Sequence, residues 1–529
     1  MKHTLHGSAV AFGPVLFLAS ALPAYAGSAP FSADPDCWHT VKGDPTRYEL
    51  LIKLNSALHS ERVGEILAGA GVEDCHDLRA ANEVCLATYK RKSAKDTPDK
   101  KSLELMKKKD HGQSVFAYVV PNAPVKLVME GEGESGARAM RSRANSCAAS
   151  SPYTVPYPSP ILTAVIDTGV DLTHPGLQAN MIPGADFSCG RLVCSALPAD
   201  TAGGHGTNMT GIIDAHDDGQ GVCGNAWNTH FIPLRAFVDV ESTDGAVGNA
   251  LAAAIKAETH ASVINASWTS QCLLPHTEEE IALAQDAGIL FVTAAGNDSV
   301  DIDLDSHKTY PAEYGRGAAK NMIVVMGHFI DPIETMPLSS WGAKTVDLAA
   351  PARAYTAQPC SEGGACYGTT GYSTSMATAY VSGAAALLKS LHTDWSAEQI
   401  KKQLMESAQP EKWLIDKNRA GGRVVLDRAV NGPLVVESPG ARHSWSRGEP
   451  HTVTWSNSYR SSLCKSVTVS ARVNGGASVM LAANADNNGQ TTVRLDGLAD
   501  GTHAVMTVTC LPGKLSADSA PFVIRTPSR

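Results

Sequence analysis

The sequence has little that would serve a nucleic-acid binder, a zinc protein or an integral membrane protein. It carries 44 Lys and Arg against 53 Asp and Glu, a formal net charge of −9, so the basic surface that nucleic-acid binding needs is missing. No C-x2-C pair has a matching partner pair, which argues against zinc. After residue 22 no apolar stretch is long enough to span a bilayer. These absences favour an ordinary globular protein.

The first 26 residues have the features of a secretory signal. Lys2 and His3 give a weakly cationic start, an apolar run covers 9–22, and Ala24 and Ala26 form an A-x-A cleavage site. The run is too short for a transmembrane anchor. We therefore expect a secreted protein, extracellular or periplasmic.

Cysteine usage agrees with export. All 12 cysteines follow the signal, and an even number in an exported chain favours disulfides. Close spacing predicts Cys189–Cys194 and Cys360–Cys366 bridges, and Cys464 could pair with Cys510. Spacing leaves open the pairing of Cys37, Cys75, Cys85, Cys147, Cys223 and Cys272.

At 529 residues the chain is too long for one core, so two or three folded units are expected. After the signal at 1–26, an α+β region with a Gly-, Ser- and Arg-rich linker covers 27–150. A central domain covers 151–432, and a small all-β domain covers 433–529. In the last domain, residues alternate with period two and Asn474-Gly475 signals a hairpin turn, which predicts a β-sandwich.

The central domain alternates apolar runs with helical patterns, which predicts an α/β fold of three layers with a mostly parallel sheet. The predicted strands cover 161–166, 231–237, 263–267, 289–295 and 322–325. The predicted helices cover 246–260, 277–287, 374–391 and 396–407.

Three short segments of this domain carry an Asp, a His and a Ser in settings that suit nucleophilic catalysis. Asp167 ends an apolar strand, His205 lies between two glycines, and Ser375 begins an Ala-rich helix. A serine hydroxyl becomes nucleophilic when an imidazole accepts its proton and a carboxylate orients that imidazole. Taken singly, the three residues could equally be a turn Asp, a packed His and a helix cap.

Together and in this order, the segments resemble those of the subtilisin-like serine proteases. The resemblance implies that Ser375 is the nucleophile, His205 the general base and then acid, and Asp167 its orienter. The segment around Asn297 resembles the one that carries the family's oxyanion asparagine, with the backbone N–H of Ser375 as second donor. The implied function is hydrolysis of peptide bonds in polypeptide substrates through an acyl-enzyme.

The residues around 263–267 resemble the family's edge segment, along which substrate adds as a β-strand. The resemblance implies substrate contacts at Ser267, Trp268, Thr269 and Ala294. Trp268-Thr269 replaces a more usual Leu-Gly, Ser373 stands where the family usually has Gly, and Ala379 replaces a Pro. These departures leave the P1 preference open.

The resemblance also implies an N-terminal propeptide that assists folding, blocks the active site and is then cut away. That role falls to residues 27–150, with the cut expected near Arg138, Arg141 and Arg143. The C-terminal domain resembles immunoglobulin-like modules appended to secreted bacterial enzymes. We expect a monomer with no nucleic-acid partner.

No cofactor is implied for catalysis, while structural calcium stays open. Residues 217–220 resemble a calcium loop of secreted members, yet Gly176 stands where their bidentate Asp follows His-Pro. Tyr310-Pro311 resembles a family turn in which a cis bond is expected.

The alternatives to a serine protease are a catalytically silent binding protein and a serine hydrolase of another class. A serine hydrolase of another class is disfavoured because no G-x-S-x-G motif surrounds Ser375. The related sedolisins use a Glu in place of the catalytic His, so His205 argues against them.

Overall fold

The computed structural model describes the chain between Pro35 and Thr526, apart from a set of internal gaps. The expected signal and linker lie outside the described residues. In the described part, no helix is both long and apolar enough to cross a membrane. The gaps cover 42–43, 55–60, 74, 76–83, 94–95, 111–112, 128–158, 190–192, 196, 201–202, 219–221, 257–258, 317–318, 330–336, 361–365, 432–433, 442, 457–463 and 513–515.

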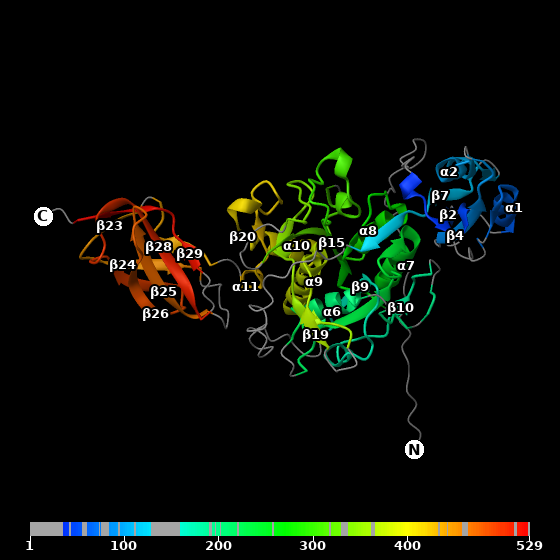
Figure 1. Cartoon of the computed structure of the whole chain (residues 1–529). Helices are drawn as coiled ribbons and strands as arrows, with labels where there is room; N and C mark the ends of the chain where they lie inside the picture. Colours follow the sequence, from blue (N-terminus) through cyan, green and yellow to red (C-terminus); the bar gives the residue numbers. More distant parts are fainter. Residues whose placement is uncertain are drawn as a thin grey trace, which may run out of the picture.

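The N-terminal domain is a five-stranded sheet with two helices, in the α+β arrangement expected (Figure 1). Its strand order is β1-β2-β4-β3, with β7 also paired to β2, and side chains such as Leu50, Ile52, Val63 and Leu105 form its core. A short antiparallel pair, β5 and β6, lies outside this sheet. The elements are η1 (Pro35–Cys37), β1 (Thr40–Val41), β2 (Asp44–Leu54), α1 (Glu61–Gly69), β3 (Val72–Glu73), β4 (Val84–Lys90), α2 (Pro98–Met106), β5 (Lys109–Asp110), β6 (Gln113–Ser114) and β7 (Phe116–Pro121).

The central domain is built on a nine-stranded sheet in the order β10-β11-β9-β13-β15-β16-β17-β21-β20. Every pair is parallel except β20 with β21. The strands are β9 (Leu162–Asp167), β10 (Ala185–Asp186), β11 (His230–Arg235), β13 (Val263–Ala266), β15 (Leu290–Ala294), β16 (Met322–His328), β17 (Leu348–Pro351), β20 (Gln409–Pro410) and β21 (Gly422–Arg423). The α-helices and 3-10 helices are α5 (Pro175–Gln178), α6 (His205–Asp214), α7 (Asp244–Ile255), α8 (Pro275–Asp286), η2 (Asp305–His307), η3 (Ala312–Arg316), α9 (Thr374–Leu391), α10 (Ala397–Glu406), η4 (Lys412–Leu414) and α11 (Leu426–Asn431).

Helices cover both faces of this sheet, which gives the predicted three layers. Ala164 and Ile166 of β9 share a core with α7 and α8, whereas Val165 between them packs against α6 and α9. In β15, Phe291 faces α8 while Val292 faces α9 and α10. Because successive side chains of a strand point to opposite faces, these strands need apolar residues at every position.

The predicted elements are found, with some displaced ends. The helix predicted over 374–391 has those bounds in the structure. The helix predicted over 246–260 was wrong at both ends, since α7 runs from Asp244 to Ile255. Thr243 caps it by accepting from the N–H of Ala246 at 3.3 Å, and Lys256 leaves the helix with ψ 147°.

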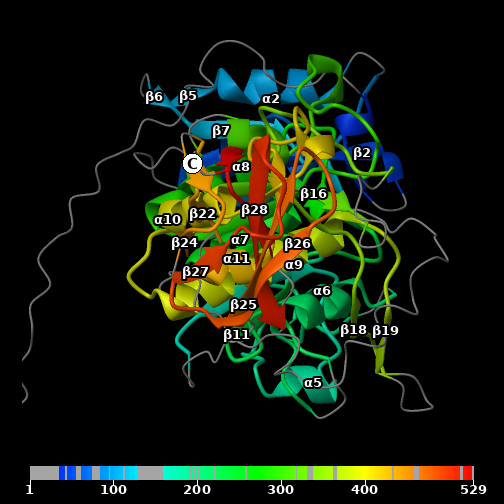
Figure 2. The ribbon, with the colours of Figure 1, turned by 90° about the vertical axis from the view of Figure 1, so that its left-hand side faces the viewer.

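The C-terminal domain consists of two sheets around one apolar core, at the far side of the central domain from the N-terminal domain (Figures 1 and 2). Trp455 comes from one sheet and Val469 and Phe522 from the other. The predicted turn has φ 49° at Asn474 and φ 75° at Gly475, and the N–H of Gly476 donates to the carbonyl of Val473 at 2.9 Å. The turn lies in a longer connection, because β26 does not begin until Val479. The strands are β22 (Val436–Ser438), β24 (Pro450–Trp455) and β27 (Gln490–Arg494), and β23 (Ser444–Ser446), β25 (Cys464–Val473), β26 (Val479–Asp486), β28 (Gly501–Pro512), β29 (Ser516–Asp518) and β30 (Phe522–Arg525).

Candidate active site

Asp167 and His205 are in direct contact. Asp167 is the last residue of β9 and His205 the first of α6, and Asp167 Oδ1 lies 2.7 Å from His205 Nδ1. A carboxylate only accepts, so Nδ1 carries the proton and the lone pair of the neutral ring is on Nε2. The Asp167 carboxylate also accepts from the N–H of Thr168 at 2.8 Å, and both side chains are buried. This is the tautomer that a general base needs.

Asp200, which no sequence motif singled out, links the segments that follow these two residues. Its carboxylate accepts from Thr168 Oγ1 at 2.9 Å, from Thr207 Oγ1 at 2.6 Å and from the N–H of Thr207 at 3.1 Å. Thr168 Oγ1 in turn accepts from the N–H of Gly206 at 2.9 Å. Burial raises the pKa of Asp200, and nearby Asp167 adds to the effect. Asp200 therefore holds β9 and α6 in register around the Asp167–His205 pair.

Ser375 is the second residue of α9, on an element packed against both others. Met376, next in the chain, shares an apolar cluster with Val165 of β9 and Met209 of α6. Ser375 is fully buried, and its Oγ donates to the carbonyl of Ser267 at 3.3 Å. The apolar cluster thus gathers the three elements that carry Asp167, His205 and Ser375.

Asn297 follows β15 and contacts the start of α9. Its Oδ1 accepts from the N–H of Thr374 at 3.0 Å, which turns Nδ2 toward Ser373 Oγ, 3.1 Å away. Ser373 Oγ also accepts from the N–H of Ser375 at 3.0 Å. The amide of Asn297 and the N–H of Ser375, both predicted from the sequence, therefore point at one place. The presence of the Ser373 hydroxyl at that place was not predicted.

The predicted substrate edge is occupied by the chain itself. Strand β8 (Pro124–Leu127) lies between β12 (Glu241–Thr243) and β14 (Trp268–Thr269), antiparallel to both. Leu127 pairs with Trp268, and its N–H donates to the carbonyl of Val240 at 2.9 Å. Trp268, the partner of Leu127, directly follows Ser267, whose carbonyl accepts from Ser375 Oγ.

The four predicted substrate-contact residues differ in what they present. Trp268 contributes backbone, because its side chain is fully buried with ring centroids of Phe237 and Phe291 each 6.4 Å away. Thr269 is half-buried, while Ser267 and Ala294 are fully buried. Ser267 directly precedes β14, whereas Ala294 is the last residue of β15, and the indole of Trp268 belongs to the core.

Structural calcium was left open by the sequence, and the described residues beside the loop at 217–220 contact one of its carboxylates themselves. A Cβ at Gly176 would clash with the hydroxyl of Tyr367, so an Asp has no room there. The Tyr367 hydroxyl donates to the carboxylate of Asp218, which lies in the loop that resembles a calcium loop. Burial and this hydrogen bond raise the pKa of Tyr367 well above its usual value. A phenol thus contacts the loop carboxylate where the family has an acidic ligand.

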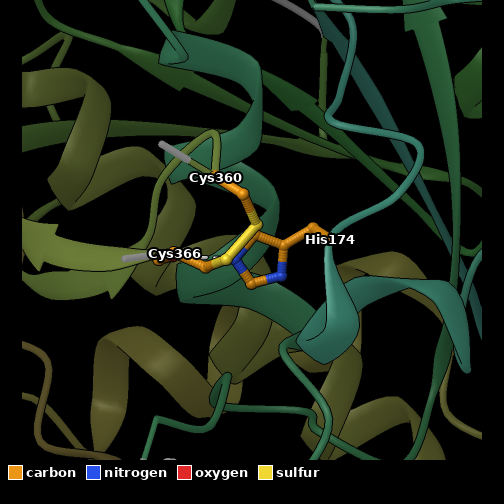
Figure 3. A group of neighbouring side chains, drawn as sticks. All are labelled: His174, Cys360 and Cys366. Atoms are coloured by element: carbon orange, nitrogen blue, oxygen red, sulfur yellow. Dashed lines mark hydrogen bonds between the residues drawn. A yellow bond between two sulfur atoms is a disulfide. The ribbon is translucent and has the colours of Figure 1, made fainter. Parts of the chain in front are cut away.

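Among the described residues one further group has metal-ligand types in proximity, namely His174, Cys360 and Cys366 (Figure 3). The two sulfurs form a disulfide, so neither is a thiolate. His174 Nδ1 accepts from the N–H of Gly176 at 3.1 Å, and Nε2 lies 2.8 Å from the carbonyl of Cys366. Both ring nitrogens of His174 therefore form hydrogen bonds, and the His174 ring packs edge-on against Tyr367. The group has a structural role.

The structure confirms two of the predicted disulfides, Cys189–Cys194 and Cys360–Cys366. It adds two that spacing could not supply, Cys75–Cys85 and Cys37–Cys272. The side chain of Cys464 lies outside the described residues, so its pairing stays a prediction. The peptide bond before Pro311 is cis, as expected.

Comparison with known proteins agrees with the geometry. The sequence profile described as the subtilase family matches residues 159–432, more than half of the chain. The chain belongs to the subtilase family. It is thus a subtilisin-like serine protease by family, and the matched range coincides with the central domain.

Individual relatives are distant in sequence. Fervidolysin of Fervidobacterium pennivorans is 30% identical over 299 residues, which is 52% of this chain and 41% of that protein. The major intracellular serine protease of Bacillus subtilis is 30% identical over 251 residues, 47% of this chain and 72% of that one. The crystal structure of fervidolysin superposes with a TM-score of 0.57 at 19% identity, covering 93% of this chain and 80% of that one, so it supports the fold.

Proposed function

We propose that this subtilase is a secreted serine endopeptidase that cleaves polypeptides through an acyl-enzyme at Ser375. The observation that carries the proposal is the 2.7 Å contact between Asp167 and His205, on elements packed against α9, whose second residue is Ser375. A carboxylate, an imidazole of fixed tautomer and a buried serine at a helix N-terminus have the chemistry of acyl transfer.

In the proposed mechanism, His205 Nε2 takes the proton of Ser375 Oγ as that oxygen attacks the scissile carbonyl. The oxyanion of the tetrahedral intermediate accepts from Asn297 Nδ2 and from the N–H of Ser375. His205 then donates the proton to the leaving amine, the C–N bond breaks, and the acyl-enzyme forms. Water, deprotonated by His205, attacks the ester and returns Ser375. Throughout, Asp167 stabilises the imidazolium and orients it.

The N-terminal domain acts as the inhibitory propeptide in this proposal. Support comes from β8, which lies as an extended strand in the cleft that a substrate would use. The register favours a maturation cut within a few residues after Leu127, closer to β8 than the arginines of the linker. N-terminal sequencing of mature enzyme tests this, and a mature chain that begins beyond residue 138 would contradict it.

A fluorophosphonate probe tests the central claim. Processed enzyme is expected to be labelled at Ser375, and Ser375→Ala is expected to abolish labelling without unfolding. Ser390→Ala in the same helix α9 is the matched control and keeps the label, since Ser390 Oγ donates to the carbonyl of Leu387 near the other end of the helix. Folded, processed wild type that resists the probe would favour a silent binding protein instead.

Deleting 433–529, the proposed accessory domain, is expected to leave small-peptide hydrolysis intact.

A further inference from the structure

The hydroxyl of Ser373 occupies the point on which the two oxyanion donors converge. Asn297 Nδ2 lies 3.1 Å from Ser373 Oγ, and the N–H of Ser375 donates to the same oxygen at 3.0 Å. Oxyanion donors lie about 2.7–3.1 Å from the oxygen they stabilise. Ser373 Oγ therefore already meets the distances that a substrate oxygen has to meet.

The surroundings hold this arrangement in place. Ser373 is fully buried and is the N-cap of α9, with extended backbone angles of φ −157° and ψ 149°. Asn297 cannot turn its amide away without losing the bond from the N–H of Thr374 to Oδ1. Glycine, the usual family residue at this position, has no hydroxyl to accept from these two donors.

We propose that Ser373 occupies the oxyanion hole of the free enzyme and must rotate its hydroxyl away before the tetrahedral intermediate forms. The inference rests on the proposed acyl-transfer function. A linear N–H bond serves one acceptor well, so the substrate oxygen and Ser373 Oγ compete for Asn297 and for the N–H of Ser375. Ser373 is thus a positioning residue that holds catalytic turnover below what the donor pair could support.

The test compares Ser373→Gly with wild type in hydrolysis of a peptide p-nitroanilide by processed enzyme. Removal of the competitor is expected to raise kcat by about 3- to 10-fold, with KM changed by less than about twofold, because the competition concerns the transition state. Ser396→Gly is the matched control, since Ser396 caps α10 in a similar way by accepting from the N–H of Gln399 at 3.2 Å. Both variants are expected to lose little thermal stability, as glycine is a tolerable N-cap.

The outcomes separate the two claims. An unchanged kcat in Ser373→Gly, with Ser375 still labelled by a fluorophosphonate, would overturn the role of Ser373 and leave the proposed function standing. A lower kcat would also overturn it, because the hydroxyl would then be a donor to the oxyanion. Absence of labelling in both proteins would overturn the proposed function and this inference together.

A second, independent observation is a disulfide that joins the N-terminal domain to the central domain. Cys37 precedes the first strand of the N-terminal domain and is bonded to Cys272, 235 positions away. The linker and β8 lie between the two cysteines in sequence. A cut anywhere in the linker therefore separates the peptide chain but not the two domains.

Other contacts at the same interface hold the N-terminal domain against the central domain. Lys53 forms an ion pair with Glu279, with exposed side-chain fractions of 12% and 11%. Asn122 Oδ1 accepts from the N–H of Gly245 at 2.9 Å, on the first turn of α7. Cys37 and Cys272 are both buried in the apolar core that includes Ala123 and Val125.

We infer that the N-terminal domain stays covalently attached after the linker is cut, and that its departure needs reduction of Cys37–Cys272 or a second cut between Cys37 and β2. A tether makes rebinding intramolecular, at an effective concentration of about millimolar for short tethers. In the reductive route a dithiol thiolate attacks one sulfur, and its second thiolate resolves the mixed disulfide. Two thiols are left on the protein and the dithiol is oxidised to its disulfide.

The tether is tested without relying on the enzyme's own activity. The Ser375→Ala precursor is cut in the linker by limited trypsin treatment, with the cut mapped by mass spectrometry. We expect one band on a denaturing gel without reductant and two bands with a dithiol. Cys37→Ser is expected to give two bands under both conditions. The Cys75→Ser/Cys85→Ser pair, which removes a bridge inside the N-terminal domain, is the control and behaves like the parent. Two bands from the parent without reductant would overturn the tether.

Inhibition by the tethered domain is tested in enzyme with Ser375 intact. Linker-cut wild type is expected to hydrolyse a peptide substrate slowly until a mild dithiol is added. Linker-cut Cys37→Ser is expected to be active from the start and unaffected by the same dithiol, which controls for reduction of other bridges. Full activity of tethered wild type without reductant would overturn the inhibitory role.

Discussion

Replacing His276 with Asn should make the precursor less sensitive to acid. His276 is fully buried in the first turn of α8, where the hydroxyl of Tyr118 from the N-terminal domain lies 3.4 Å from Nδ1. Burial lowers its pKa from 6.5 to about 3, with a smaller contribution from nearby Lys53. The folded protein therefore keeps this ring neutral at pH values where the unfolded chain protonates it.

The effect of His276 on stability at different pH values follows from proton linkage. Between pH 6.5 and about 3, only the unfolded chain binds this proton, so the free energy of unfolding falls as the pH falls through that window. From pH 7 to pH 5 the loss is about 2 kcal/mol, at about 1.36 kcal/mol per pKa unit. Burial raises the pKa of Asp244 to about 6 and of Glu280 to about 8, which stabilises the fold in acid. Both groups remain in the variant, so most of their effect cancels in the difference between the two proteins; the remainder comes from Glu280 Oε1, which lies 3.9 Å from His276 Nδ1.

The assay is thermal unfolding at pH 7 and pH 5 in a Ser375→Ala background, which prevents self-cleavage. The stability gap between wild type and His276→Asn should shift by about 2 kcal/mol in favour of the variant at pH 5, a change of several degrees in Tm. His260→Asn is the control, because His260 is exposed and its φ of 37° suits Asn. A gap of equal size at both pH values would refute the reasoning.

Three further predictions concern the site and the interface. Asp167→Asn should lower kcat by about 10⁴ in peptide hydrolysis while circular dichroism stays unchanged, since the tautomer of His205 is lost; an activity near wild type would contradict the role of Asp167. Asp200→Ala removes three hydrogen bonds and should lower kcat by about 10–100-fold, whereas Asp200→Asn should retain more activity. Lys53→Met leaves Glu279 buried without its partner, which should cost about 3–5 kcal/mol in thermal melts of the precursor; Lys53→Met with Glu279→Gln should recover part of it.

Local patterns predicted much of the fold. The strand containing Asp167 and the helix that begins at Thr374 were recognisable because strands buried on both faces must be apolar throughout, and because an Ala-rich helix carries its own period. Asp167, His205 and Ser375 lie within short characteristic segments, so they could be proposed as catalytic residues from the sequence. The helix ends of α7 were missed, because the cap at Thr243 is one polar residue among several candidates.

Contacts between distant segments could not be predicted. Asp200 acts through Thr168 and Thr207, and nothing in their separation along the chain indicates that these side chains meet. Cys37–Cys272 spans 235 positions, and six cysteines allow many pairings. Ser373 was visible as a departure from the family, but which way its hydroxyl points depends on the backbone angles at the start of α9.

The position of β8 bears on which proteins the enzyme can attack. β8 is the middle strand of a sheet whose outer strands, β12 and β14, both belong to the central domain. A substrate that replaces it has to offer about four consecutive residues as a bare strand, with hydrogen bonds available on both edges. A helix or an interior strand of a folded protein must first be pulled open to do so, which costs the local unfolding free energy of that segment. Under the proposed function, the site between β12 and β14 therefore favours loosely folded proteins over intact ones as substrates.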